Sequence, residues 1–125
     1  MATFTTSLIT NTRATGTAAT NLIVNSRNLG SSSASIVVVV FGVPESTLIL
    51  TPLYVTGFTL PANSANIRQF FIAGNVSYEV QYSITSPFSQ VVMSSYGIDE
   101  FGNLVTDQRV LQSELTPTNS LSIPV

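Results

Sequence analysis

Short runs of β-branched and aromatic residues, separated by turn residues, follow one another along almost the whole chain of 125 residues. The clearest run extends from Val76 to Ile84, where every second residue is apolar and the intervening residues are serine, glutamate or glutamine. Because the side chains of a strand alternate between two faces, this run predicts a strand with one buried face. Helical periodicity is almost absent, so the chain is predicted to be all-β.

Further strands are predicted wherever such runs lie between Gly, Pro, Asn and Ser turns. The run from Ile36 to Phe41 is apolar at every position, which is typical of a strand covered on both faces. A turn about every 10 residues favours a sandwich or a barrel, and we predict a jelly-roll-type antiparallel β-sandwich of about eight strands. The other predicted strands are Leu22–Ser26, Thr47–Leu60 broken at Pro52, Asn66–Ala73, Phe88–Ile98 and Leu104–Leu115.

Residues 1–20 differ from the rest of the chain, because Thr, Ala and Ser dominate and the only bulky apolar side chains are Phe4, Leu8 and Ile9. Gly16, between two threonines, is predicted to be a flexible joint. We predict an extended N-terminal connector arm over residues 1–20 and a single β-sandwich domain over residues 21–125. A frayed terminus is one interpretation. High β-propensity and low charge favour the other, a strand donated to a second subunit, with Phe4 and Leu8 on one face.

Only 8% of the residues are charged, against about 25% in an ordinary soluble domain. Ser, Thr and Asn take the place of the charges, and these short side chains lose little entropy when another surface packs on them. The composition therefore favours a subunit whose surface becomes buried in an assembly of copies of itself.

The chain contains neither histidine nor cysteine. This composition excludes a Ser-His-Asp triad, a cysteine nucleophile and an imidazole or thiolate metal site. The carboxylates of Asp99 and Glu100 are adjacent in sequence and should point to opposite faces of a strand, so they should not converge on one substrate atom. We therefore predict a protein that is not an enzyme and has no cofactor or metal.

Two weaker candidates for ligand binding remain. Residues 99–103 could offer oxygen ligands to Ca²⁺, but they lack the EF-hand spacing, and a solvated hairpin turn is favoured. The four tyrosines could form a sugar-binding platform, although tyrosines at strand period more often lie in a core or an interface. They are Tyr54, Tyr78, Tyr82 and Tyr96.

The basic residues and the N-terminus argue against two classes of partner. Four arginines are scattered singly along the chain and form no stripe that could neutralise successive phosphates, so nucleic acid is not expected. No apolar run approaches the ~20 residues of a membrane helix, so no membrane partner is expected. The N-terminus lacks the features of a secretory signal, and we expect synthesis in the cytoplasm without a signal peptide.

Two stretches near the C-terminus, YGIDEFGNLV from Tyr96 to Val105 and QRVLQSELT from Gln108 to Thr116, are the most distinctive part of the sequence. They resemble a C-terminal pattern of surface proteins from endospore-forming Firmicutes. The whole chain, with its Ser/Thr-rich start and short β-runs, resembles the jelly-roll subunits of bacterial endospore appendages.

This resemblance implies a structural subunit that assembles with itself into a fibre on the spore surface, with an anchoring spore-surface protein as a further partner. It also implies that the connector runs from Ala2 to about Thr20. Many such subunits have connector cysteines that cross-link the fibre, and this chain departs from them because it has none. Alternative functions are a viral capsid or tail protein and a carbohydrate-binding β-sandwich.

Charges are scarce, and two of them, Arg109 and Glu114, fall in the distinctive C-terminal stretch. We predict that they lie close to a subunit boundary or brace the last strand. At five residues apart on a regular strand the two side chains face opposite sides, so each is expected to have a different partner.

Overall fold

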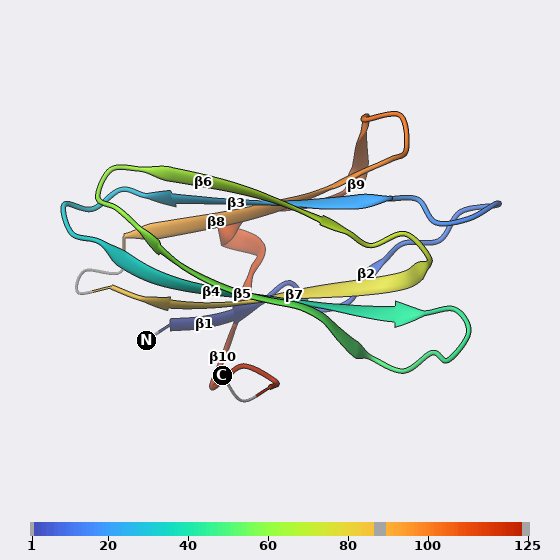
Figure 1. The fold of residues 1–125 in the computed structure, drawn as a ribbon, viewed down its shortest axis with the longest axis horizontal. Helices are drawn as coiled ribbons and strands as arrows, with labels where there is room; N and C mark the ends of the chain where they lie inside the picture. Colours follow the sequence, from blue (N-terminus) through green and yellow to red (C-terminus); the bar gives the residue numbers. More distant parts are fainter. Residues whose placement is uncertain (1, 87–89, 124–125) are drawn as a thin grey trace.

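Two antiparallel β-sheets packed face to face make up the protein (Figure 1). The computed structural model describes residues 2–86 and 90–123. Within these ranges the elements are β1 (Ala2–Thr5), β2 (Ile9–Thr10), β3 (Asn21–Asn28), β4 (Ala34–Pro44), β5 (Thr51–Leu60), β6 (Ala65–Phe71), β7 (Asn75–Thr85), β8 (Val91–Ile98), β9 (Leu104–Val110), the 3-10 turn η1 (Gln112–Glu114) and β10 (Thr116–Thr118).

The larger sheet has the strand order β10-β1-β7-β4-β5, with β2 also paired to β7. The smaller sheet has the order β6-β3-β8-β9. Every pair of neighbouring strands is antiparallel, so the prediction of an all-β, antiparallel sandwich is confirmed. The finer prediction of jelly-roll connectivity stays a prediction.

The two predicted strands with the strongest patterns, β4 and β7, lie side by side in the larger sheet. Val80 and Tyr82 of β7 face the smaller sheet, as the alternation predicts. Ile36, Val38 and Val40 of β4 join them, whereas Val39 and Phe41 are buried although they do not belong to this core. The prediction that β4 is covered on both faces is therefore confirmed.

Apolar side chains from both sheets fill the space between them and form one continuous core. The smaller sheet contributes Leu22, Val24, Phe70 and Met93, and two tyrosines of β7 lie in the same core. Both of these tyrosines, Tyr78 and Tyr82, are fully buried, so neither is part of an exposed sugar-binding platform.

Some strand boundaries differ from the prediction. Residues 47–50 precede β5 as a turn, in which Leu48 has a φ of 56° and its N–H donates to the Pro44 carbonyl at 2.8 Å. Pro52 lies inside β5, at the irregular register opposite Phe41. Strand β9 ends at Val110 instead of continuing to Leu115, and the predicted strand residues Phe88 and Ser89 lie outside the described residues.

The largest difference concerns residues 2–20, the N-terminal segment. The sequence predicts an extended arm, but β1 and β2 pair with β7 of the same subunit, with Phe4 opposite Tyr82 and Ile9 opposite Tyr78. The free edge of β7 offers hydrogen bonds and apolar contacts that the local sequence pattern cannot reveal.

The C-terminal part adds one more strand and a tail that the sequence pattern does not predict. Within the part of the chain that the structure describes, strand β10 pairs only with β1, with Thr118 opposite Thr3. Beyond it, the tail lies against the outer face of the larger sheet (Figure 1). There the Gln81 side chain donates to the Ser122 hydroxyl at 2.7 Å and accepts from the Ser122 N–H at 2.8 Å.

We expect stability to be independent of pH near neutrality and to fall in alkali. Burial raises the pKa of Tyr78 and Tyr82 above the ordinary value of 10.0. A pKa raised by folding gives stability that is complete below the unfolded value and is lost as pH rises above it. The urea concentration at half unfolding should be the same at every pH from about 6 to 9 and should be lower at about pH 11.

The double variant Tyr78→Phe/Tyr82→Phe is the control, because it should lose much of the alkaline decline. An alkaline decline of the same size in this variant would contradict the assignment to these two phenols.

Candidate assembly surface

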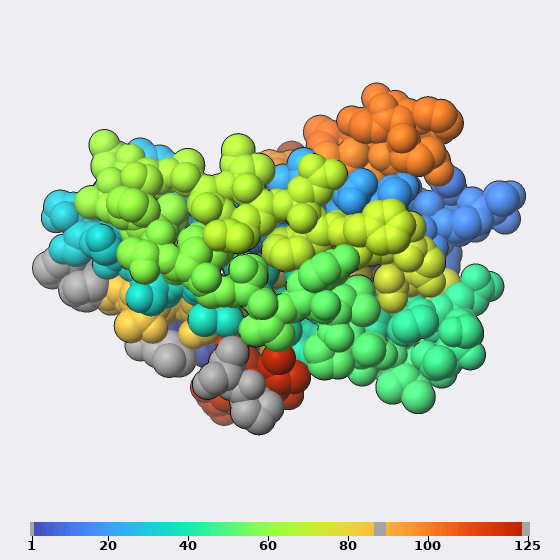
Figure 2. Space-filling model, viewed as in Figure 1, coloured from blue at the N-terminus to red at the C-terminus, as the bar shows by residue number. Residues whose placement is uncertain are grey.

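Strands β5 and β6 are each the last strand of their sheet, so one side of the sandwich presents two open edges. We call this the open side. Figure 2 looks onto it, and the green and yellow-green atoms of these strands cover the middle of the view. Edge strands carry unpaired backbone N–H and C=O groups, which can pair with another chain.

The side chains of the open side are unusually apolar. Val55 is 50% exposed, Ile67 72% and Phe71 59%. Arg68 is the only charged residue in the two strands, and the only proline is Pro52 near the start of β5. Natural edge strands are usually protected from association by charges, prolines or bulges, and β6 has little of this protection.

Side chains between β5 and β6 hold the two edges together. The rings of Tyr54 and Phe70 lie 5.2 Å apart, and the Tyr54 hydroxyl donates to the Phe71 carbonyl at 2.8 Å. The Arg68 guanidinium lies 4.2 Å from the centre of the Phe58 ring. These contacts link the two edge strands through their side chains.

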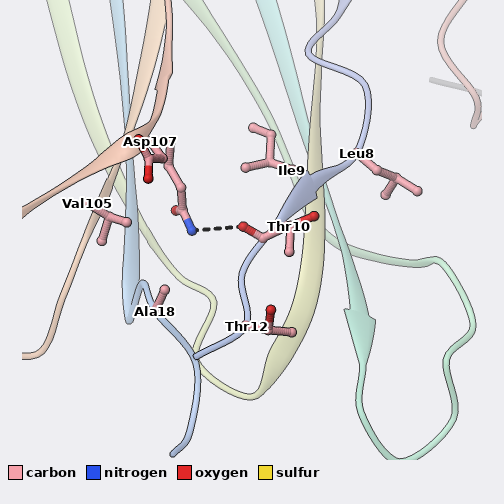
Figure 3. A pocket seen from close by; sticks show the side chains of 8 residues that line it. Leu8, Ile9, Thr10, Thr12, Ala18, Val105 and Asp107 are labelled. Carbon is pink, nitrogen blue, oxygen red and sulfur yellow. Dashed lines mark hydrogen bonds between the residues drawn. The ribbon is translucent and has the colours of Figure 1, made fainter. Parts of the chain in front are cut away.

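The opposite side of the sandwich has a groove of about 530 Å³ between the N-terminal segment and β9 (Figure 3). Gln108 lies at its base, where its side-chain amide donates to the Thr10 carbonyl at 3.2 Å and to the Asn11 side chain at 2.8 Å. Its side-chain oxygen accepts from the Tyr78 hydroxyl at 2.8 Å. The Gln108 amide is thus used within the subunit, where it ties β9 to β7 and to the N-terminal segment.

The predicted interface residues of the N-terminal segment separate into two groups. Phe4 and Ile9 pack against the core of their own subunit, whereas Leu8 is 57% exposed at the groove. The prediction that Phe4 and Leu8 share one strand face is wrong. Ser7 has a φ of 63°, which interrupts the strand between β1 and β2 and so breaks the alternation.

Gly16 lies in a loop whose ends, Thr12 and Thr17, form a β-bridge. Its φ of 72° is in the left-handed region that favours glycine. In the same loop, the Arg13 guanidinium donates two hydrogen bonds to the Glu100 carboxylate, one of them of 2.8 Å. These hydrogen bonds lower the pKa of Glu100 and raise that of Arg13, so the loop is tethered to the turn after β8.

The structure separates Arg109 and Glu114. Arg109 is exposed on β9, and among the described residues it has no ion-pair partner. The Glu114 carboxylate accepts a hydrogen bond from the Leu111 N–H at 2.8 Å and so braces the turn that follows β9. Whether either residue lies at a subunit boundary stays a prediction.

The other ligand-binding candidates have structural roles. The Asp99 carboxylate accepts hydrogen bonds from the N–H groups of Phe101 and Asn103, both at 2.9 Å, as expected for a hairpin turn. Within residues 2–86 and 90–123 there is no cluster of acidic side chains that could hold a metal ion. Over the same ranges, no helix is long and apolar enough to cross a membrane.

No protein-family model matches the chain, and no curated protein matches its sequence.

Sequence reasoning did not identify Arg68, Gln108 or the edge position of β6. No local signal marks Gln108, because Thr106, Asp107 and Arg109 beside it are polar as well. The edge position of β6 has little local signal, because the strand has no proline and only one charged residue.

Two buried tyrosines of β7 should respond differently to loss of the hydroxyl. Tyr78→Phe leaves the Gln108 amide with an unpaired oxygen and should lower the free energy of unfolding by about 1–3 kcal/mol. The Tyr82 hydroxyl is buried, and its contact with the Ser95 hydroxyl lies outside ordinary hydrogen-bond geometry, so Tyr82→Phe should cost less than about 1 kcal/mol. Urea unfolding of both variants measures the difference, and equal losses would contradict the proposed role of Gln108.

Substitutions of Arg109 and Glu114 can also be compared with each other through the stability of the single subunit. Arg109→Ala should change the free energy of unfolding by less than about 0.5 kcal/mol, because the side chain is exposed and unpaired. Glu114→Ala removes the acceptor for the Leu111 N–H and should cost about 1 kcal/mol. A loss above about 1 kcal/mol for Arg109→Ala in the monomer would reveal a contact within the subunit.

Proposed function

We propose that this protein is a non-enzymatic structural subunit that assembles with copies of itself into a fibre or filament. Its contacts are strand pairing at open sheet edges and donation of the N-terminal segment to a neighbouring subunit. The observation that carries the proposal is the open side, where two adjacent edges expose Val55, Ile67 and Phe71 and Arg68 is the only charged residue.

Contact through the open side alone is too weak to hold a stable polymer together. Burying the rest of Val55, Ile67 and Phe71, which are already partly buried, would contribute at most about 1.5–3 kcal/mol for each side chain. Association costs about 4–15 kcal/mol in lost translational and rotational freedom. A single contact of this size is therefore weak, and a stable polymer needs a second contact that acts together with the first.

The N-terminal segment can supply this second contact. In the single subunit, β1 lies between β7 and β10, and the loop of residues 12–17 lets the chain fold back. If that loop opens, the same β1 and β2 can pair with β7 of a neighbour, and Phe4 and Ile9 can occupy the same places in the neighbour's core. Such an exchange creates few new contacts and loses few, so it is a low-cost route to association.

The cellular setting we propose is a bacterial endospore appendage on the spore surface. Its support is the resemblance of residues 96–116, which in this fold form the end of β8, the groove-lining strand β9 and the braced turn before β10. Synthesis in the cytoplasm without a signal peptide, self-association and an anchoring spore-surface protein belong to the same proposal.

A pair of introduced cysteines tests the donation of the N-terminal segment. Thr3 and Ser83 are direct neighbours on β1 and β7, at a separation that suits a disulfide, and the natural chain has no cysteine to interfere. In filaments of Thr3→Cys/Ser83→Cys, oxidation should give a ladder of covalent oligomers on a non-reducing denaturing gel. Each rung is expected because the two cysteines of a pair belong to different subunits.

The single variant Thr3→Cys is the control and should give no ladder. If the double variant forms filaments but yields only internally cross-linked monomers, donation of the segment is ruled out. If concentrated protein stays a monomer in sedimentation and in electron micrographs, the assembly function itself is ruled out.

A further inference from the structure

The backbone groups that β6 leaves unpaired can be identified from its hydrogen bonds to neighbouring strands. The Ser64 carbonyl accepts from Asn28, and the Ile72 N–H donates to Thr20, each at 2.9 Å, so both residues face β3. Backbone direction alternates along a strand, which turns the even-numbered residues of β6 toward β3. The odd-numbered residues Ala65, Ile67, Gln69 and Phe71 therefore direct their N–H and C=O groups to the open edge.

One further contact agrees with this assignment. The Phe71 carbonyl accepts a hydrogen bond from the Tyr54 hydroxyl of β5, which lies beyond the open edge of β6. A backbone carbonyl has two lone pairs, so this contact leaves one for an N–H of a second strand. The same odd-numbered residues are exposed on the outer face of the smaller sheet, whereas Phe70 is buried on the inner face.

The two large apolar side chains of this edge are arranged symmetrically. Ile67 and Phe71 stand on the same outer face, with Gln69 midway between them. An antiparallel pair that is centred on Gln69 would place each Ile67 opposite a Phe71 of the other strand. Cross-strand pairs of a β-branched and an aromatic residue are among the favourable ones in antiparallel sheets.

We propose that β6 pairs with β6 of a second copy of this chain, about a two-fold axis at Gln69. The proposal rests on the self-assembly proposed above and names the strand, the partner and the register. The smaller sheets of the two copies then join into one continuous sheet, and Ile67 and Phe71 partly cover each other on its outer face, which lowers their exposure to water.

Charge selects this register over its neighbour. An axis at Arg68 would set the two guanidinium groups directly opposite each other, and opposed like charges destabilise a strand pair. With the axis at Gln69, each Arg68 lies opposite a Phe70 of the second copy. Arg68 has no carboxylate partner among the described residues, so the pairing breaks no ion pair.

The other edge of the smaller sheet is a poorer candidate. Strand β9 has an irregular register with β8 between Ser95 and Gly97, and it carries Asp107 and Arg109 on its exposed part. Bulges and charges are the features that keep natural edge strands from pairing. The contrast favours β6 as the pairing edge.

A two-fold contact closes a pair and does not extend by itself. In the proposed fibre, growth therefore depends on the N-terminal segment, and the β6 contact supplies a dimeric building block.

Gln69→Cys tests the register in a chain with no other cysteine. Opposed residues of a hydrogen-bonded antiparallel pair have Cα atoms about 5.5 Å apart, which lies within the range of disulfides. Mild oxidation of the assembled protein should give a covalent dimer on a non-reducing denaturing gel. In the matched control Ala65→Cys, the two cysteines would be about 27 Å apart along the joined strands, and no dimer band should form.

A second variant measures the contact without cysteines. Ile67→Lys places a charge on the pairing edge and should weaken dimer formation at least about tenfold in sedimentation. Leu104→Lys, which changes a similarly exposed side chain on β9 at the other edge of the smaller sheet, is the control and should retain the dimer. The β-type circular dichroism spectrum should be unchanged in both variants.

The outcomes separate this inference from the proposed function. Filaments of Gln69→Cys that form no cross-link, or equal cross-linking in Ala65→Cys, would overturn the β6 register and leave fibre assembly in place. A specific covalent dimer of Gln69→Cys without filaments would support the β6 contact and count against the fibre. Monomers that neither cross-link nor polymerise would overturn both.

Discussion

The hydrogen bonding of β7 on both of its edges is the interaction on which the rest of the structure depends. Strand β4 pairs with one edge of β7 from Ser35 to Pro44, and the N-terminal strands β1 and β2 pair with the other. Among the described strands, β10 has only β1 as a neighbour, so its place in the sheet also depends on β7. Tyr78 extends this influence across the sandwich, because its hydroxyl reaches Gln108 of β9. One strand thus links both termini and both sheets.

The sequence predicts most strands of the sandwich, because alternation and turn residues are local signals. Val76–Ile84 and Ile36–Phe41 show this most clearly, and both lie in the middle of the larger sheet. The pairing of residues 2–10 with β7 could not be predicted, since it depends on an edge that is more than 60 residues away along the chain. Strand β10 has only three residues, and one of them is Pro117, so no sequence pattern predicts it as a strand.

The candidate assembly surface was predicted only in its general character. Low charge favours a surface that is covered in an assembly, which stays a prediction, and it does not indicate which surface. The scarcity of charge predicts interface roles for Arg109 and Glu114. The charged residue that lies between the two open edges is instead Arg68. Whether Ile67 and Phe71 are core or surface depends on which strands flank β6. Strand order comes from contacts that are distant in sequence, so residue periodicity alone cannot supply it.

Strand β10 also bears on how fast subunits could associate and separate. Because β1 lies between β7 and β10, an N-terminal segment cannot enter or leave its place without breaking hydrogen bonds on both of its edges. The Gln81–Ser122 hydrogen bonds hold the chain beyond β10 against the same sheet, so they are further contacts that exchange of the segment would have to break. Two closed subunits would therefore exchange their N-terminal segments slowly. A segment that is paired on both edges in a neighbour would also be released slowly. The lifetime of a junction of this kind is governed by an opening rate as much as by an affinity.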